Sequence, residues 1–290
     1  MATAGSLAAN IRVVYGDPDA DWLTDAVALQ FLTKGQKRFC HNVLTLDEIK
    51  DYTITAKKIR YDLPTNCIIP NGVMWYQSRT AKLAPLSPDK WRGMEEAFPN
   101  ATGTPDYYGI ERQQLLLGPN VPTTNSATAL VSGAMTATAT ILGFTVASGT
   151  FRTKGFLEIA SGTSKEIVEF TGVATTTVTG VTRGLHNTTA ASFASGASVT
   201  QIDLQLHYRK SPTDLTATTQ TPDIPEIYHE YLEKYALYLA WISRGETQHA
   251  TVAYQEFLTY EQAAQKTIGR RMQDGVMRIQ DKRNRFYAGW

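Results

Sequence analysis

The sequence has very few cysteines and no excess of charge of either sign, and each shortage excludes a class of protein. Cys40 and Cys67 are the two cysteines among 290 residues. Two thiols are too few for a disulfide framework and wrongly spaced for a zinc knuckle, so we expect both to be reduced and packed as small hydrophobic side chains. The formal net charge of +1 excludes a protein that coats nucleic acid through a broadly basic surface, although it leaves room for a local basic patch.

Long hydrophobic runs are missing as well. No stretch approaches the ~20 apolar residues that a membrane span needs. Residues 1–21 lack the basic start and apolar run of a signal peptide. We therefore expect a soluble protein that is made in a cytoplasm and does not contact a membrane. Its 290 residues give room for one large domain or two modest ones.

The motifs that would carry catalysis or hold a metal are incomplete. Residues 229–233 read H-E-x-x-E and lack the second histidine of a zinc-protease helix. The acidic residues from position 17 onward fail as a calcium loop, because Trp22 replaces the required glycine and Ala28 replaces the bidentate glutamate. No Gly-x-Ser-x-Gly elbow of hydrolases is present. We therefore expect no enzymatic activity, no catalytic residue, no cofactor and no metal.

The amino-acid composition of the sequence changes between about Asn125 and Thr200. More than half of this stretch is Ser, Thr, Ala or Gly, its charge is sparse, and no helical stripe runs through it. Short apolar runs bounded by turn residues predict strands at 156–159, 166–170 and 177–181. We predict an all-β module, residues 126–200, inserted into a host domain whose two halves must still pair.

Helical patterns flank this stretch. Before it, acidic residues from Asp17 onward and the apolar positions after them predict a helix that runs to about Gly35. After it, Pro225 opens a helix that Gly245 ends, and a second helix reaches about Met272. The short connection predicts an antiparallel hairpin.

The expected fold class is α+β, in which a helical host domain with a small sheet carries the all-β module. The host comprises residues 1–125 and 201–273, and residues 274–290 form a C-terminal tail.

The first helix of the hairpin carries a stripe of tyrosines that allows two interpretations. These side chains either pack in the core or form a seam between copies of the protein. The candidate seam residues are Tyr228, Tyr231, Tyr235 and Tyr238.

The tail combines basic charge with large aromatic side chains, the residue types that dominate protein interfaces. The candidate docking residues are Arg278, Lys282, Arg283, Arg285, Phe286, Tyr287 and Trp290. A disordered basic tail is the alternative, although such a tail seldom contains Phe, Tyr and Trp together.

Several short motifs, in a fixed order, resemble head-to-tail adaptor (connector) proteins of tailed bacteriophages. They are Tyr61-Asp62-Leu63-Pro64, Gly103-x-Pro105-x-x-Tyr108, Leu115-x-Leu117-x-Pro119 and the start of a helical hairpin at Ile224-Pro225. The β stretch is similar to small modules of phage tail and neck proteins, through Glu166–Phe170, Val181–Gly184 and Gly196–Val199. It departs from them at residues 186–188, where His-Asn-Thr stands in place of the usual Gly-Thr.

The resemblance implies a structural virion protein at the phage neck, made in the host cytoplasm. It would form a ring, typically dodecameric, below the portal, extending the DNA channel and joining the capsid to the tail. Its implied partners are the portal protein, neighbouring copies of itself and a tail, stopper or other neck protein, while double-stranded DNA passes through without sequence-specific binding. The alternative is a tail tubular or baseplate component, or a host-recognition module that carries the same β insert.

Overall fold

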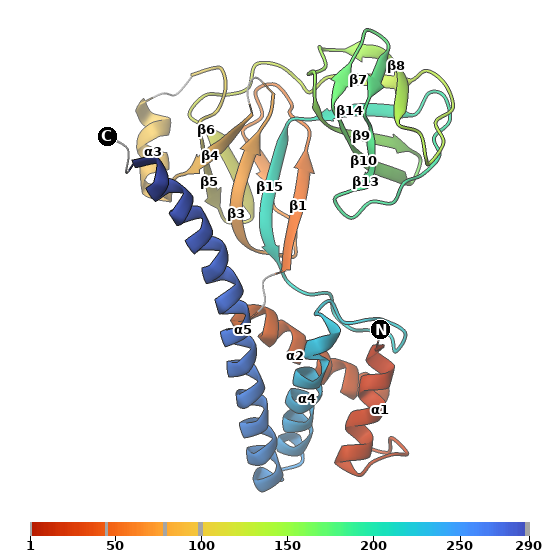
Figure 1. The fold of residues 1–290 in the computed structure, drawn as a ribbon, viewed down its shortest axis with the longest axis vertical. Helices are drawn as coiled ribbons and strands as arrows, with labels where there is room; N and C mark the ends of the chain where they lie inside the picture. Colours follow the sequence, from red (N-terminus) through yellow and green to blue (C-terminus); the bar gives the residue numbers. More distant parts are fainter. Residues whose placement is uncertain (1, 44–45, 78–79, 98–100, 288–290) are drawn as a thin grey trace. The chain divides into compact units, whose positions relative to one another are not determined.

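The computed structural model describes residues 2–43, 46–77, 80–97 and 101–287, without the side chains of Pro88, Glu95 and 268–287. Within these ranges the chain forms five α-helices and two β-sheets (Figure 1), which confirms the expected α+β class. The chain divides into two compact units: a helical unit, residues 1–46 and 211–290, and a β unit, residues 47–210. This division groups the strands of residues 47–125 with the predicted module, and the insertion itself stays a prediction.

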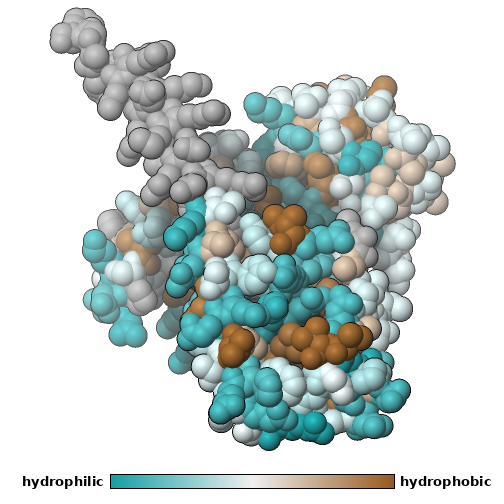
Figure 2. Space-filling model, turned by 60° about the horizontal axis from the view of Figure 1, so that its bottom comes forward, coloured by the Kyte–Doolittle hydropathy of each residue, from teal (hydrophilic) through white to brown (hydrophobic). Residues whose placement is uncertain are grey.

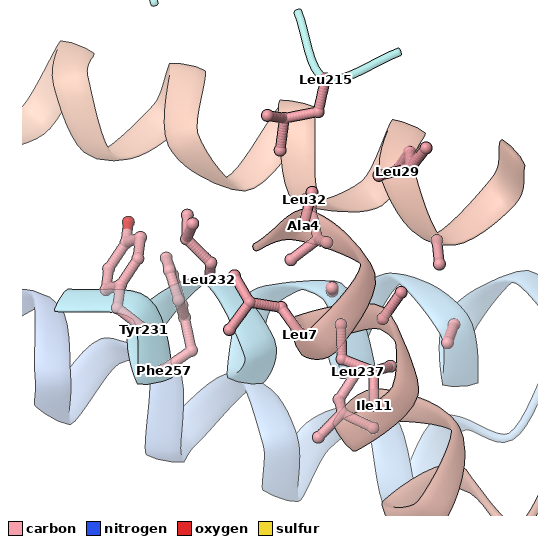
Figure 3. Packing of buried hydrophobic residues seen from close by; sticks show 14 of the residues in the cluster. Ala4, Leu7, Ile11, Leu29, Leu32, Leu215, Tyr231, Leu232, Leu237 and Phe257 are labelled. Atoms are coloured by element: carbon pink, nitrogen blue, oxygen red, sulfur yellow. The ribbon is translucent and has the colours of Figure 1, made fainter. Parts of the chain in front are cut away.

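The helical unit is built around a central helix. Its elements are α1 (Ala4–Tyr15), α2 (Asp25–Asn42), the 3₁₀ turn η1 (Glu226–Tyr228), α4 (His229–Ser243) and α5 (Thr247–Tyr287). Helix α4 packs against α1, α2 and α5. Figure 3 shows side chains from all four helices meeting in one core, among them Ile11, Leu32, Leu232 and Phe257, none of which is exposed to solvent. Burying each such side chain contributes roughly 1.5–3 kcal/mol, so this core holds the helices together.

The predicted helix from Asp17 to about Gly35 is wrong at its start. The Asp17 carboxylate accepts backbone hydrogen bonds from Leu23 (2.7 Å), Trp22 and Asp21 (both 3.1 Å). These bonds fold the acidic segment into a turn and lower the pKa of Asp17, and α2 begins only at Asp25. The sequence pattern does not predict helix α1, which precedes this turn.

The predicted end of this helix is also wrong, because α2 continues through Gly35 to Asn42. A Cβ atom on Gly35 would lie 3.3 Å from Cδ2 of Leu232 and 3.4 Å from Cδ1 of Tyr235. Gly35 is therefore a point of close approach between α2 and α4, and its missing side chain serves packing rather than helix termination.

One sheet of the β unit has seven strands in the order β1-β15-β3-β4-β5-β6-β2. The strands are β1 (Leu46–Tyr52), β2 (Arg60–Asp62), β3 (Cys67–Trp75), β4 (Ala81–Pro85), β5 (Tyr107–Glu111), β6 (Gln114–Gly118) and β15 (Leu204–Lys210), with helix α3 (Pro88–Ala97) between β4 and β5. The motifs that resemble phage adaptors gather here: Tyr61 pairs with Leu115, and Tyr108 with Leu117.

The other sheet has eight strands in the order β11-β12-β8-β7-β14-β9-β10-β13. They are β7 (Thr128–Val131), β8 (Ile141–Ser148), β9 (Gly155–Ser161), β10 (Ser164–Phe170), β11 (Gly172–Val173), β12 (Thr177–Thr179), β13 (Thr182–Leu185) and β14 (Ser198–Ile202). The three strands predicted in this stretch are therefore confirmed as β9, β10 and β12. The sheet has its own hydrophobic core, whose buried members all lie between Ala127 and Val199. We call residues 126–200 the β module.

Candidate interaction surfaces

The predicted tyrosine seam lies largely inside the helical unit. Tyr231 is 2 % exposed, and its ring lies 4.5 Å from that of Phe39 and 4.7 Å from that of Phe257. Tyr228, Tyr235 and Tyr238 are half-buried and pack against the same core. Tyr231 thus has almost no surface to offer another copy, while the other three keep part of theirs.

A buried polar cluster fastens α5 to α2 and α4. The Glu261 carboxylate is 6 % exposed and accepts a hydrogen bond from Asn42 Nδ2 (2.7 Å). It also lies 3.6 Å from the Arg38 guanidinium, which stands over the Phe257 ring at 4.7 Å. A buried carboxylate needs such partners, and Asn42 and Arg38 supply them from α2.

Beyond this cluster α5 continues without a break. The sequence predicts an end of the second hairpin helix near Met272, but α5 runs to Tyr287. Gly275 alone does not stop it, and no proline follows. The predicted docking residues from Arg278 to Tyr287 therefore have helical backbone, while their side chains and the whole of Trp290 lie outside the described residues.

Apolar side chains are exposed at several points of the helical unit. Val13 and Val14 on α1 are 72 % and 64 % exposed, and Val252 on α5 is 61 % exposed. Ile227 in η1 is 74 % exposed. Figure 2 shows apolar areas of this kind set among hydrophilic side chains.

In the β unit, one buried ion pair joins the two sheets where the chain passes between them. Asp203 is fully buried between β14 and β15, and its Oδ1 lies 3.3 Å from Nη2 of Arg152. Ser126 Oγ donates to Asp203 at 2.6 Å, and Gln201 Nε2 at 2.8 Å. Burial raises the pKa of Asp203 and lowers that of Arg152, because both charged forms lose water. Ser126 lies at the first chain crossing and Asp203 at the second, and Arg152 also donates to the Tyr76 carbonyl oxygen at 2.9 Å, so these contacts hold the β module to the seven-stranded sheet.

A second polar contact between the sheets lies beside a cavity of about 280 Å³. His186 Nδ1 lies 2.7 Å from Asp51 Oδ2, and Asn187 Nδ2 donates to Glu48 at 2.8 Å. His186 and Asn187 have φ values of 49° and 63°, in the left-handed region that favours glycine. The departure from Gly-Thr in this segment therefore supplies two side chains that bind the first strand of the other sheet.

The carboxylate in this contact is already paired. Burial would raise the pKa of Glu48, but hydrogen bonds from Tyr208, Asn187 and Asn66 and the charge of Lys210 outweigh it and lower the pKa. A carboxylate held in its charged form by four partners is a poor proton donor at neutral pH.

The histidine of the incomplete zinc-protease motif is engaged in the fold. His229, from the H-E-x-x-E segment, is buried, and its Nε2 lies 3.1 Å from the Ile224 carbonyl oxygen. Among the described residues, no three His, Cys, Asp or Glu side chains come together to hold a metal ion.

None of the helices in the described part of the chain has the length and apolar character that a membrane crossing requires.

Comparison with protein families places these features in a known group. The family model described as SU10 adaptor protein matches residues 2–285, a range that takes in both units. No curated protein matches the chain.

Proposed function

The chain belongs to the SU10 adaptor protein family, a phage adaptor family, and on this premise we propose that it is a head-to-tail adaptor of the virion neck. Copies of the chain form a ring below the portal, typically dodecameric, that extends the DNA channel and joins the capsid to the tail. The observation that carries this proposal is the family match over residues 2–285.

The near-neutral net charge of the chain supports a role in lining a channel through which DNA passes. A strongly basic lumen would bind the phosphate backbone and hold DNA, whereas a formal charge of +1 leaves the DNA free to slide. Double-stranded DNA therefore passes through the ring without sequence-specific binding. The ring's other partner is a tail, stopper or further neck protein.

The C-terminal part of α5 is the proposed portal-docking element. Helix α5 is fastened to the helical unit through Glu261 and then continues to Tyr287. The segment from Arg278 to Trp290 has four basic residues and three aromatic ones, which suit an acidic, grooved partner. When such residues bind a partner, a helix anchored at one end loses less conformational entropy than a free tail does.

The three half-buried tyrosines, Tyr228, Tyr235 and Tyr238, stay candidates for contacts between copies. A structural virion role requires no cofactor, and the paired or buried polar groups of the β unit are consistent with that role.

Co-sedimentation with a purified portal ring tests the docking proposal. Full-length chain is compared with a chain truncated after Asp274, which keeps Glu261 and the buried part of α5. Binding by the full-length chain alone supports the adaptor role and its docking helix. Equal binding by both chains keeps the adaptor role and moves its portal contact elsewhere.

Failure of both chains to bind the portal would overturn the adaptor role. A tail tubular, baseplate or host-recognition role would then take its place, and binding of residues 126–200 to cells or glycans would identify the last of these.

A further inference from the structure

The outward face of α1 carries no charge. Its inward face is made of Ala4, Leu7, Ala8, Ile11 and Tyr15, all buried. The residues away from this core are exposed and uncharged: Ser6, Ala9, Asn10, Val13 and Val14. At the edge of this face, Asn10 Nδ2 donates to the Glu233 carboxylate of α4 at 2.9 Å. The one charged residue of the helix, Arg12, is turned toward α2, where it pairs with Asp25 and donates to the Leu23 carbonyl oxygen at 2.7 Å.

Helix α5 has an outward face of the same kind over about four turns. Its inward residues Ala250, Ala253, Phe257, Glu261 and Ala264 are buried. At helical spacing on the opposite side stand exposed, uncharged residues: Gln248, Thr251, Val252, Gln255, Thr259, Gln262 and Ala263. Two charged residues border this face: Glu256, which is engaged with Lys234 of α4, and the exposed Lys266, which lies one turn beyond Gln262 where the uncharged stretch ends.

Charge-free outward faces are not general in this unit. Helix α2 exposes Lys34 and Lys37, and α4 exposes Glu230. A helix face that stays in water normally carries charged residues, whereas the buried centre of a protein interface is depleted of them. The outward faces of α1 and α5 therefore have the composition of surfaces that become covered.

The two faces point away from each other. Helix α4 packs between α1 and α5, as Figure 1 shows within the helical unit, so the faces lie on opposite sides of it. A ring of identical copies needs a heterologous contact, in which one patch of each copy meets a different patch of the next. One compact unit thus carries two different patches on opposite sides, with matching residue types.

We propose that the outward face of α1 packs against the outward face of α5 on the neighbouring copy, an inference that rests on the ring of the proposed function. Charged residues stand only at the edges of the two faces: Glu233, which accepts from Asn10, beside the α1 face, and Lys266 at the end of the α5 face. The centre of the contact therefore buries no unpaired ion. The amide and hydroxyl groups of both faces can donate and accept hydrogen bonds across it, while Val13, Val14 and Val252 lose their exposure to water.

Three substitutions in the full-length chain test this contact. Val13→Asp places a carboxylate on the α1 face, and Gln255→Asp places one on the α5 face. Ile227→Asp is the matched control, because Ile227 is equally apolar and exposed in the same unit but lies on neither face. All three positions are exposed, so we expect thermal unfolding of each variant to stay close to that of the wild type.

Purified portal rings are mixed with half the amount of chain that would fill every ring. The measurement is the mass distribution of the resulting complexes, which gives the number of chains bound to each portal. A lateral contact makes filling cooperative, so wild type and Ile227→Asp should give full rings beside empty portals. Val13→Asp and Gln255→Asp should each give a statistical spread of partly filled portals. An equal mixture of the two variants should give an excess of portals that carry two chains side by side. In such a pair the intact α1 face of Gln255→Asp meets the intact α5 face of Val13→Asp.

Other outcomes overturn the contact in distinguishable ways. Cooperative filling by all variants, or statistical filling by the wild type, removes the α1–α5 contact and leaves the adaptor role standing. Loss of cooperativity in only one of the two variants indicates a contact between like faces. Failure of the wild type to bind the portal removes the adaptor role and this contact with it.

Discussion

Glu166 and Arg183 form a bidentate ion pair inside the β module. Arg183 Nε lies 2.7 Å from Glu166 Oε1, and Nη2 lies 2.6 Å from Oε2. The side chains are 0 % and 9 % exposed, and the backbone N–H groups of Gly184 and Ala191 also donate to the carboxylate. Both residues belong to the motifs by which this stretch resembles small β modules of phage proteins. The pair gives those motifs a physical role, because it ties β10 to β13.

Replacing Arg183 should destabilise the β module strongly. Arg183→Met leaves Glu166 buried without its counter-charge, and loss of one partner of a buried pair costs about 3–5 kcal/mol. Urea unfolding gives the free energy directly. The control is Glu158→Gln in the partly exposed pair of Glu158 with Lys165, which should cost no more than about 1 kcal/mol. Equal losses from the two variants would contradict the account.

The same pair predicts a dependence of stability on pH. Burial alone would raise the pKa of Glu166, but the hydrogen bonds from Arg183, Ala191 and Gly184 outweigh it and lower the pKa. A lowered folded-state pKa contributes stability that is fully present above the unfolded value of about 4.3 and is lost as the pH falls through the lower folded value. The free-energy difference between wild type and Glu166→Gln should therefore shrink between pH 6 and pH 3. A difference that stays constant in urea titrations over this range would be evidence against the pair.

The close approach of α2 and α4 at Gly35 predicts a steric effect. Gly35→Leu improves helix propensity but forces Leu232 and Tyr235 away, and such overpacking typically costs about 1–3 kcal/mol. Gly93 in α3 is the matched control, since a Cβ atom there would meet nothing within 4 Å, and Gly93→Ala should be neutral or slightly stabilising. Thermal unfolding of both variants checks this, and a stable Gly35→Leu chain would show that the helices do not meet there.

The reactivity of the Cys40 thiol should differ between the folded and the unfolded chain. Cys40 is 7 % exposed, and burial raises its pKa to about 12, so almost no thiolate is present at pH 8. A disulfide reagent at pH 8 should leave Cys40 unmodified in the native protein and modify it in urea. Cys67 is partly exposed with a raised pKa and should react slowly. Rapid native labelling of Cys40 would contradict its packing in the helical core.

Periodicity makes the strongly patterned elements predictable. The tyrosine and alanine stripes of α4 and α5 and the alternating strands of the β module follow from local sequence. Helix α1 lacks such a signal because its outward face is Ser, Ala, Asn and Val, so the contrast between polar and apolar faces is weak. Gly35 has the local signature of a helix end, although its role is set by Leu232, far away in the sequence.

The polar contacts within the β unit do not follow from sequence spacing. His186 and Asp51 are separated by 135 positions, and only the pairing of strands brings them together. The sequence motifs do mark Arg183 and Glu166, but nothing local indicates that they meet. The sequence predicts a shorter α5 because the apolar stripe of the helix ends at Met272 and a basic, aromatic segment follows it.

The number of copies on the portal tests the central claim most directly. Full-length chain in excess is mixed with purified portal rings, and the mass of the isolated complex is measured. The adaptor account predicts a single saturated species in which one closed ring of chains, matching the symmetry of the portal, is bound. A portal that remains free at saturating concentration, or one that carries copies unrelated to its symmetry, would contradict it.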